Sequence, residues 1–118
     1  LRIASALLAR CSELDVVLEV ESGVVGGEED GIVGPANGRD ELYTTSSDLL
    51  RVADVLGIGE RGRYLLAATF GNVHGNYAPG NVVLRPEMLQ AGRQALTAAY
   101  SGRPVPVCVP WQQRIRRA

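Results

Sequence analysis

The stretch YLLAATFG at residues 64–71, an almost continuously apolar run that ends in glycine, indicates the fold most clearly. A run of this kind is typical of a strand that is buried on both faces in a parallel sheet. A second run, VVLEVE at residues 16–21, has the same β-branched, apolar character. The sequence therefore predicts two buried parallel strands, and residues 105–109 have a composition that would begin a third.

Helical patterns alternate with these strands. Residues 3–14 carry apolar side chains at mostly helical spacing, namely Ile3, Leu7, Leu8 and Leu14. A second helix is predicted after a capping sequence at residues 45–48, ending at Gly57, with an inward face of Leu49, Val52, Ala53 and Leu56. A third is predicted between Pro86 and Gly102, with an inward face of Leu89, Gly92, Leu96 and Ala99. This order predicts an α/β fold with right-handed crossovers.

The composition excludes several classes of protein. Of the 118 residues, 46% are hydrophobic and 21% are charged, and the net charge is −1. Such values do not fit a disordered chain or a dedicated nucleic-acid binder. No apolar run is long enough for a membrane span, no secretory signal opens the chain, and Cys11 and Cys108 do not suggest a disulfide scaffold. We therefore expect a cytoplasmic protein whose partners include neither nucleic acid nor membrane.

The basic residues and the single histidine limit the chemistry. All 12 basic residues are arginines, so no lysine of this chain can form a Schiff base. His74 is the only histidine, so a metal site with several imidazole ligands cannot be completed within the chain. The chain also begins in the middle of a helical pattern without an initiator methionine. We therefore expect a fragment of a longer protein.

Carboxylates lie near the predicted carboxyl ends of the strands, where βαβ folds gather their functional residues. Glu19 and Glu21 are two positions apart and share one face of a strand. They are either ligands of a cation or partners of an arginine in a salt bridge.

Two glycine-rich stretches carry the other candidate residues. GGEEDG at residues 26–31 lies in a long irregular segment, residues 22–43, and glycines on both sides are typical of a loop that swings carboxylates into a site. A solvated acidic turn has the same sequence, whereas the ligand spacing of an EF-hand is missing. His74 follows the second strand and is either a metal ligand, a general base or a structural histidine.

Together these stretches resemble the class II, metal-dependent fructose-bisphosphate aldolases. The similar segments are LEVESGVVGGEEDG at 18–31, LYTTSSD at 42–48 and YLLAATFGNVHGNYAPGNVVLRPEML at 64–89, in the order and spacing of that family. The resemblance covers residues 16–104. It implies that residues 1–106 are part of a (β/α)8 TIM barrel, about two to three βα units of it.

The resemblance also implies an activity. Enzymes of this family reversibly cleave fructose 1,6-bisphosphate to dihydroxyacetone phosphate and glyceraldehyde 3-phosphate in glycolysis and gluconeogenesis. A Zn²⁺ ion held by three histidines polarises the ketose carbonyl and stabilises the enediolate, and a second divalent or monovalent cation has a position nearby. The substrate is a sugar bisphosphate, and the full-length enzymes are often homodimers or larger.

The family motifs assign roles to five residues of this sequence. His74 matches the middle zinc ligand by its FGNVHG setting, and Glu21 matches the glutamate of the alternative metal position. Glu29, the second acid of GGEEDG, matches the residue that moves the proton, and Glu28 is its supporting neighbour. Gly75 matches the glycine whose backbone meets the substrate beside the metal.

The chain departs from the family pattern at three places. Ser22 replaces an aliphatic residue, and Ala78 replaces a lysine near the substrate phosphate, which would weaken phosphate binding. Residues 107–118 replace a strand that reads FVFHGGSGS in the family and carries the third zinc histidine. Reading the codons of residues 107–115 one nucleotide later permits Phe-Val-Phe-His-Gly-Ser-Ser-Gly-Ser, so we hypothesise that this tail is translated out of frame. Genomic DNA without a shift here would refute the hypothesis.

The isolated 118-residue polypeptide is expected to be inactive and poorly soluble, because its parallel strands would expose apolar faces and unpaired edges. Two alternatives to a fructose-bisphosphate aldolase remain open at this point. The chain is a non-catalytic product of a damaged aldolase gene, or it belongs to a related ketose-bisphosphate aldolase of the tagatose type.

Overall fold

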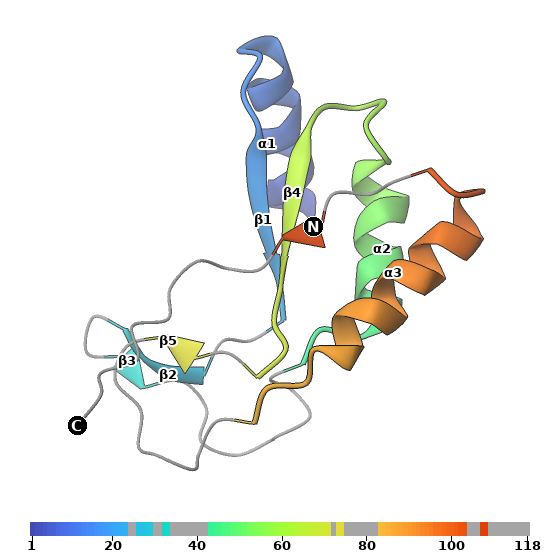
Figure 1. The fold of residues 1–118 in the computed structure, drawn as a ribbon. Helices are drawn as coiled ribbons and strands as arrows, with labels where there is room; N and C mark the ends of the chain where they lie inside the picture. Colours follow the sequence, from blue (N-terminus) through green and yellow to red (C-terminus); the bar gives the residue numbers. More distant parts are fainter. Residues whose placement is uncertain are drawn as a thin grey trace.

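A three-stranded parallel sheet forms the centre of the computed structural model, which describes residues 1–23, 26–29, 32–33, 43–71, 73–74, 83–103 and 107–108 (Figure 1). Its strands, in the order β1-β4-β6, are β1 (Leu18–Ser22), β4 (Tyr64–Ala68) and β6 (Val107–Cys108). The register pairs Leu18 with Tyr64 and Ser22 with Ala68. Spatial order thus follows chain order, as in the wall of a βα barrel.

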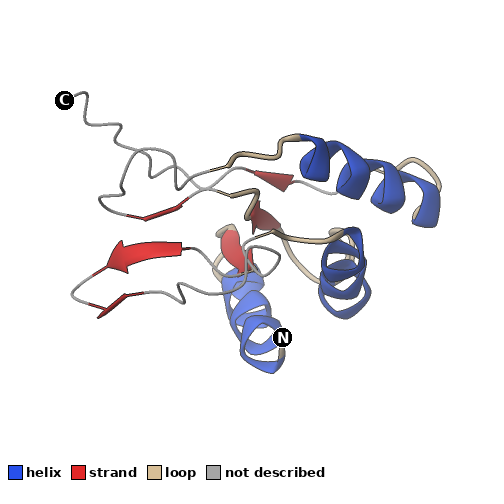
Figure 2. Cartoon of the chain, turned by 90° about the horizontal axis from the view of Figure 1, so that it is seen from below, coloured by secondary structure: helices blue, strands red, loops and turns tan. Residues whose placement is uncertain are grey.

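Three helices alternate with these strands: α1 (Arg2–Glu13), α2 (Ser46–Leu56) and α3 (Glu87–Ala99). All three lie on one side of the sheet (Figure 2). The core lies between these helices and the sheet, and it consists of Leu8, Leu49, Val52, Ala53, Leu56, Tyr64, Leu66, Ala68 and Leu96. Helices on one side only distinguish a barrel wall from a doubly wound sheet, which has helices on both faces.

The local signals for α2 are confirmed in full. The Thr45 hydroxyl accepts a hydrogen bond from the backbone N–H of Asp48, and the Asp48 carboxylate accepts one from the N–H of Thr45, which completes a capping box. Each of the four predicted inward residues of α2 is buried. The helix ends at Gly57, whose φ of 81° favours glycine.

Gly92 lies where α3 crosses α2. A Cβ atom built on Gly92 would clash with the Leu49 side chain, so the missing side chain allows the two helices to approach. Gly92 and Leu96 are buried, as expected, whereas the prediction for Ala99 was wrong because this residue is exposed. Ala95 is half-buried instead.

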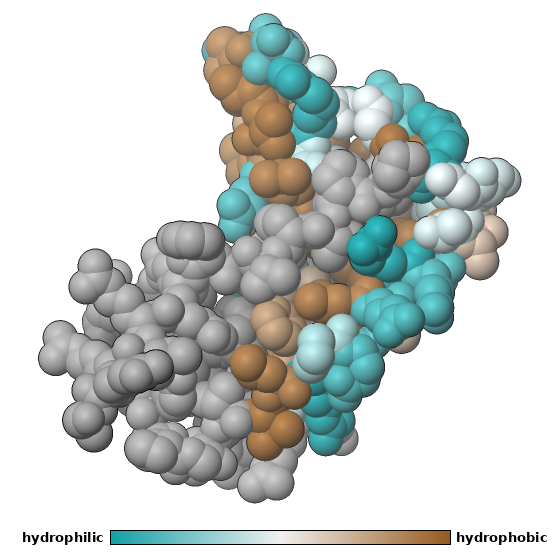
Figure 3. Space-filling model, in the orientation of Figure 1, coloured by the Kyte–Doolittle hydropathy of each residue, from teal (hydrophilic) through white to brown (hydrophobic). Residues whose placement is uncertain are grey.

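Apolar residues of α1 and of the segment before β1, among them Val16 and Val17, remain exposed (Figure 3). On α1 only Leu8 is buried, whereas Ile3 and Leu7 are exposed. The expectation that β1 is buried on both faces was also wrong, because its residues alternate between half-buried and exposed. The reason is the same in both cases: among the residues that the structure describes, nothing packs against these surfaces.

A second, smaller sheet forms within the glycine-rich segments, which corrects the expectation that residues 22–43 are irregular throughout. Its order is β3-β2-β5, from β2 (Gly26–Glu29), β3 (Ile32–Val33) and β5 (Val73–His74). β2 and β3 are antiparallel, while β2 and β5 are parallel. Within the described part of the chain, none of the helices is long and apolar enough to cross a membrane.

Candidate functional site

The carboxyl ends of β1 and β4 lie at one edge of the parallel sheet, and the chain continues from each of them into the smaller sheet (Figure 1). There, Gly26 pairs with Val73, and Gly27 pairs with His74. The structure therefore brings the GGEE segment beside the only histidine, although the two are far apart in sequence. This juxtaposition is the geometric core of the candidate site.

Glu28 and Glu29 follow Gly27 on the same strand and form its antiparallel ladder with β3, opposite Val33 and Ile32. Both acidic residues thus belong to β2, which pairs on its other side with β5, the strand that contains His74. Gly75, the predicted substrate-binding glycine, lies outside the described residues, as does Ala78.

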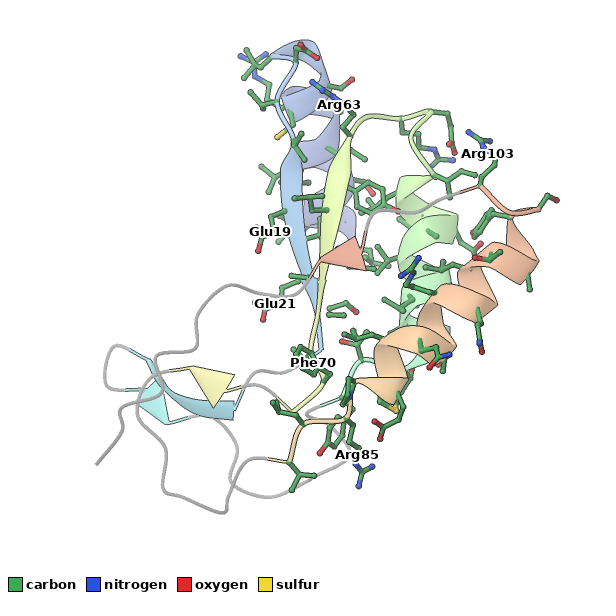
Figure 4. All side chains as sticks on the ribbon, viewed as in Figure 1. Glu19, Glu21, Arg63, Phe70, Arg85 and Arg103 are labelled. Atoms are coloured by element: carbon green, nitrogen blue, oxygen red, sulfur yellow. The ribbon has the colours of Figure 1, made fainter. Side chains whose placement is uncertain are left out.

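Glu19 and Glu21 share one face of β1, as the spacing predicted, and both are exposed. Figure 4 shows their side chains projecting to the same side of the strand, away from α2 and α3. In the described part of the chain the ion pairs are Arg10–Glu13 and Arg63–Asp15, so the salt bridge considered for the two strand glutamates is not found there.

The donors for a metal ion are only partly present. Glu21 offers a carboxylate at the open face of the sheet, and His74 stands on the strand that pairs with β2. Carboxylate oxygen and imidazole nitrogen are ligands that Zn²⁺ accepts, and the donor set therefore fits this ion in kind. The side chains that the structure describes contain no cluster of three metal-binding residues.

A buried pair of threonines, which the sequence patterns did not reveal, lies at the carboxyl ends of β1 and β4. Thr44 and Thr69 are 2% and 0% exposed. The Thr44 hydroxyl donates to the backbone carbonyl of Ser22 and accepts from the N–H of Thr69, at 2.7 Å. Its second acceptor position faces the Thr69 hydroxyl at 3.0 Å. Because the one proton of Thr44 is already used, Thr69 is the donor in that bond.

The backbone reinforces this contact. The N–H of Thr44 donates to the carbonyl of Thr69 at 2.7 Å, and Tyr43 forms an antiparallel bridge with Phe70. Gly23, with φ of 114°, lies against the two hydroxyls so closely that a Cβ atom would clash with Thr69. We call the hydrogen-bonded set of Ser22, Thr44 and Thr69 the threonine clasp.

A second set of contacts fixes the segment that leads into α3. The N–H of Arg85 donates to the Phe70 carbonyl at 2.8 Å, and the Tyr43 hydroxyl donates to the Val83 carbonyl at 2.9 Å. The Arg85 guanidinium lies 4.7 Å from the centre of the Tyr43 ring, a cation–π distance. Figure 4 shows Phe70 and Arg85 at the end of the sheet where Glu21 lies. For the threonine clasp, the one available sequence signal was a polar residue, Thr69, within the apolar run at residues 64–70.

Comparison with known proteins shows the same family over most of the chain. The family model described as fructose-bisphosphate aldolase class-II matches residues 1–109. The fructose-bisphosphate aldolase of Corynebacterium glutamicum is 57% identical over 94 residues, which are 80% of this chain and 27% of that protein. The Mycobacterium leprae enzyme is 54% identical over 101 residues, which are 86% of this chain and 29% of that protein. The chain thus spans less than a third of the length of these relatives.

Solved structures agree with the fold. The crystal structure of fructose-bisphosphate aldolase from Campylobacter jejuni superposes with a TM-score of 0.61 at 34% sequence identity, covering 85% of this chain and 27% of that one. An aldolase structure from Coccidioides immitis also gives a TM-score of 0.61, at 32% identity, covering 82% of this chain and 31% of that one. The expected fold class, a partial TIM barrel, is confirmed.

Proposed function

Because this chain belongs to the class II fructose-bisphosphate aldolase family, we propose that its protein reversibly cleaves fructose 1,6-bisphosphate to dihydroxyacetone phosphate and glyceraldehyde 3-phosphate. The observation that carries the proposal is the ladder between β2 and β5. It joins an acidic strand to a histidine strand beside the carboxyl end of a parallel sheet, where barrel enzymes hold their catalytic residues.

His74 is the residue that would hold Zn²⁺, and Glu21 would serve the alternative metal position or a second cation. When bound, the ion supplies a Lewis acid that polarises the substrate carbonyl. The exposed carboxylate of Glu21 supports this assignment, because it faces the open side of the sheet without an ion-pair partner among the described residues. The remaining ligands would come from outside this chain.

Glu29 is the proposed acid–base residue, and Glu28 supports it. Abstraction of a proton beside a carbonyl needs a carboxylate that approaches after the substrate binds. Gly26 and Gly27 precede the two acids, and the wide range of conformations open to a glycine backbone supports this role. Gly75 would hold substrate through its backbone.

The substrate is a sugar bisphosphate, and the proposed setting is the cytoplasm, with a homodimer or larger assembly for the full-length protein. Neither nucleic acid nor a membrane is part of the proposal. With Ala78 in place of the usual lysine, we expect a raised KM for bisphosphate substrates. The 118 residues alone are proposed to be inactive, because they offer only part of the metal ligands.

A chimera tests the proposal directly. Residues 1–106 of this chain would replace the matching segment of the Corynebacterium glutamicum aldolase, to which the chain is 57% identical. We expect a folded chimera that cleaves fructose 1,6-bisphosphate in the presence of Zn²⁺. A folded, zinc-binding chimera without this activity would refute the proposal, and preference for tagatose 1,6-bisphosphate would identify the related aldolase instead.

A second chimera that continues to residue 118 tests the tail. If residues 107–118 are read out of frame, this chimera loses activity while the first retains it. Equal activity of the two chimeras would reject the out-of-frame hypothesis and the division of the chain at residue 106.

A further inference from the structure

The two ladders on either side of the site do not share one register. Gly26 follows Ser22 by four positions, whereas Val73 follows Ala68, the ladder partner of Ser22, by five positions. The β4 side therefore contains one residue more than the β1 side between the large sheet and the small one. The large sheet cannot by itself set the register of the small sheet.

Register matters here because neighbouring residues of a strand lie on opposite faces. A slip by one residue between β2 and β5 would exchange the faces of Glu28 and Glu29 relative to His74. A site that uses one of these acids as a base needs that choice to be fixed. Contacts between the two ladders are therefore needed to define the register in which β2 and β5 pair.

The threonine clasp occupies this position. Ser22 is the last residue of β1, and Thr69 directly follows the last residue of β4. Thr44 binds both of them, and its hydroxyl uses its full capacity of one donated and two accepted hydrogen bonds. Burial strengthens the constraint, since Thr44 and Thr69 are almost fully buried and the loss of this hydroxyl would remove the hydrogen-bond partner of the Ser22 carbonyl and of the Thr69 N–H.

We propose that Thr44 is a positioning residue of the active site, which fixes the exits of β1 and β4 and so sets the register in which the Glu28–Glu29 strand pairs with the His74 strand. The catalytic meaning of this inference rests on the proposed function. Its test measures the ladder itself and not activity, so the two proposals can fail separately.

Hydrogen exchange of the folded chimera that carries residues 1–106 of this chain, followed by mass spectrometry, is the test. Thr44→Val keeps the shape of the side chain and removes the hydroxyl, Thr44→Ser keeps the hydroxyl, and Thr45→Val is a neighbouring control that removes a helix cap. We expect Thr44→Val to speed exchange in residues 26–29 and 73–74 by about tenfold or more, the effect of one unsatisfied buried group. The core helix α2 keeps its protection, and Thr44→Ser restores the slow exchange.

Three results would overturn the inference. The first is equal exchange of the two ladders in the wild type and Thr44→Val. The second is the same acceleration in α2 as in the ladders, including complete loss of protection in an unfolded variant, which would show a general effect on stability. The third is acceleration of the ladders by Thr45→Val as large as that by Thr44→Val.

Discussion

Gly27 and His74 are partners in the parallel ladder between β2 and β5. Two sequence motifs that lie on different βα units are thereby brought side by side, with a glycine at the contact. Because Glu28 and Glu29 follow immediately, the backbone alone brings the acid–base candidates to the strand of the metal-ligand candidate.

Substitution of Glu29 should affect the chemical step. In the active chimera, Glu29→Gln is expected to lower kcat by about 10²–10⁴-fold with little change in KM, because a positioned general base contributes on this scale. Glu28→Gln, the matched control on the same strand, should have a clearly smaller effect. Steady-state kinetics checks both variants, and a larger loss in Glu28→Gln would reverse the assignment of the two roles.

Substitution of His74 should affect metal binding. His74→Ala in the chimera removes a proposed ligand, so zinc affinity measured by competition with a chelating dye should fall by about tenfold or more. Glu21→Gln should change this affinity less, because Glu21 is assigned to the alternative position. Unchanged zinc affinity in His74→Ala would remove this residue from the metal site.

The capping box of α2 should make stability depend on pH. Hydrogen bonds from the Thr45 hydroxyl and then from its N–H lower the pKa of Asp48, and Arg51 acts in the same direction. A pKa that is lower in the folded state stabilises the fold above the unfolded value of about 4, and this contribution disappears as the pH falls through the folded value. In urea denaturation, Asp48→Asn should therefore be less stable than the wild type at pH 7, with a smaller difference at pH 3. A difference that grows toward low pH would contradict the assignment.

Gly71 should tolerate substitution less well than Gly59. Both have positive φ, 96° and 115°, so alanine is strained at either position by about 1–2 kcal/mol. A Cβ atom on Gly71 would also clash with the backbone carbonyl of Val83, whereas a Cβ atom on Gly59 would meet no atom within 4 Å. We expect Gly71→Ala to cost about 1–3 kcal/mol more than Gly59→Ala in urea denaturation. Equal losses would show that the Val83 segment moves away freely.

The exposed apolar surface of α1 should drive self-association. Ile3 and Leu7 are 69% and 49% exposed, whereas Leu8 on the same helix is 2% exposed. Ile3→Glu with Leu7→Glu is expected to increase the soluble, monomeric fraction in sedimentation experiments without loss of helical signal. Leu8→Glu should instead unfold the chain, because it places a charge in the core. If the double substitution leaves self-association unchanged, the surface through which the chain associates lies elsewhere.

The sequence predicts most accurately what local interactions determine. The α2 helix, its cap, its inward face and its end follow from residues within a few positions of one another, and all were predicted correctly. The inward position of Ala99 was predicted wrongly, and Ile3 and Leu7 of the first helix are exposed, because apolar periodicity identifies a helix face but not whether another element packs against it.

The site shows the same division between local and long-range information. The positions of Glu21, Glu29 and His74 near strand ends follow from the order of elements. The pairing of Gly27 with His74 and the threonine clasp depend on hydrogen bonds between distant segments, and such bonds leave no periodic pattern in the sequence. Thr44 lay within a recognisable motif, yet only the fold shows the three hydrogen bonds that its hydroxyl makes to Ser22 and Thr69.

The crossover topology of the large sheet has a consequence for how this chain reaches its native state. Leu18 pairs with Tyr64 only after a long loop containing α2 has closed, so the entropy of closure opposes the ladder until late. The capping box lets α2 form early from neighbouring residues. We expect slow folding in which helical circular dichroism precedes protection of the β1 amides, with β1 the segment most exposed to wrong pairing during synthesis.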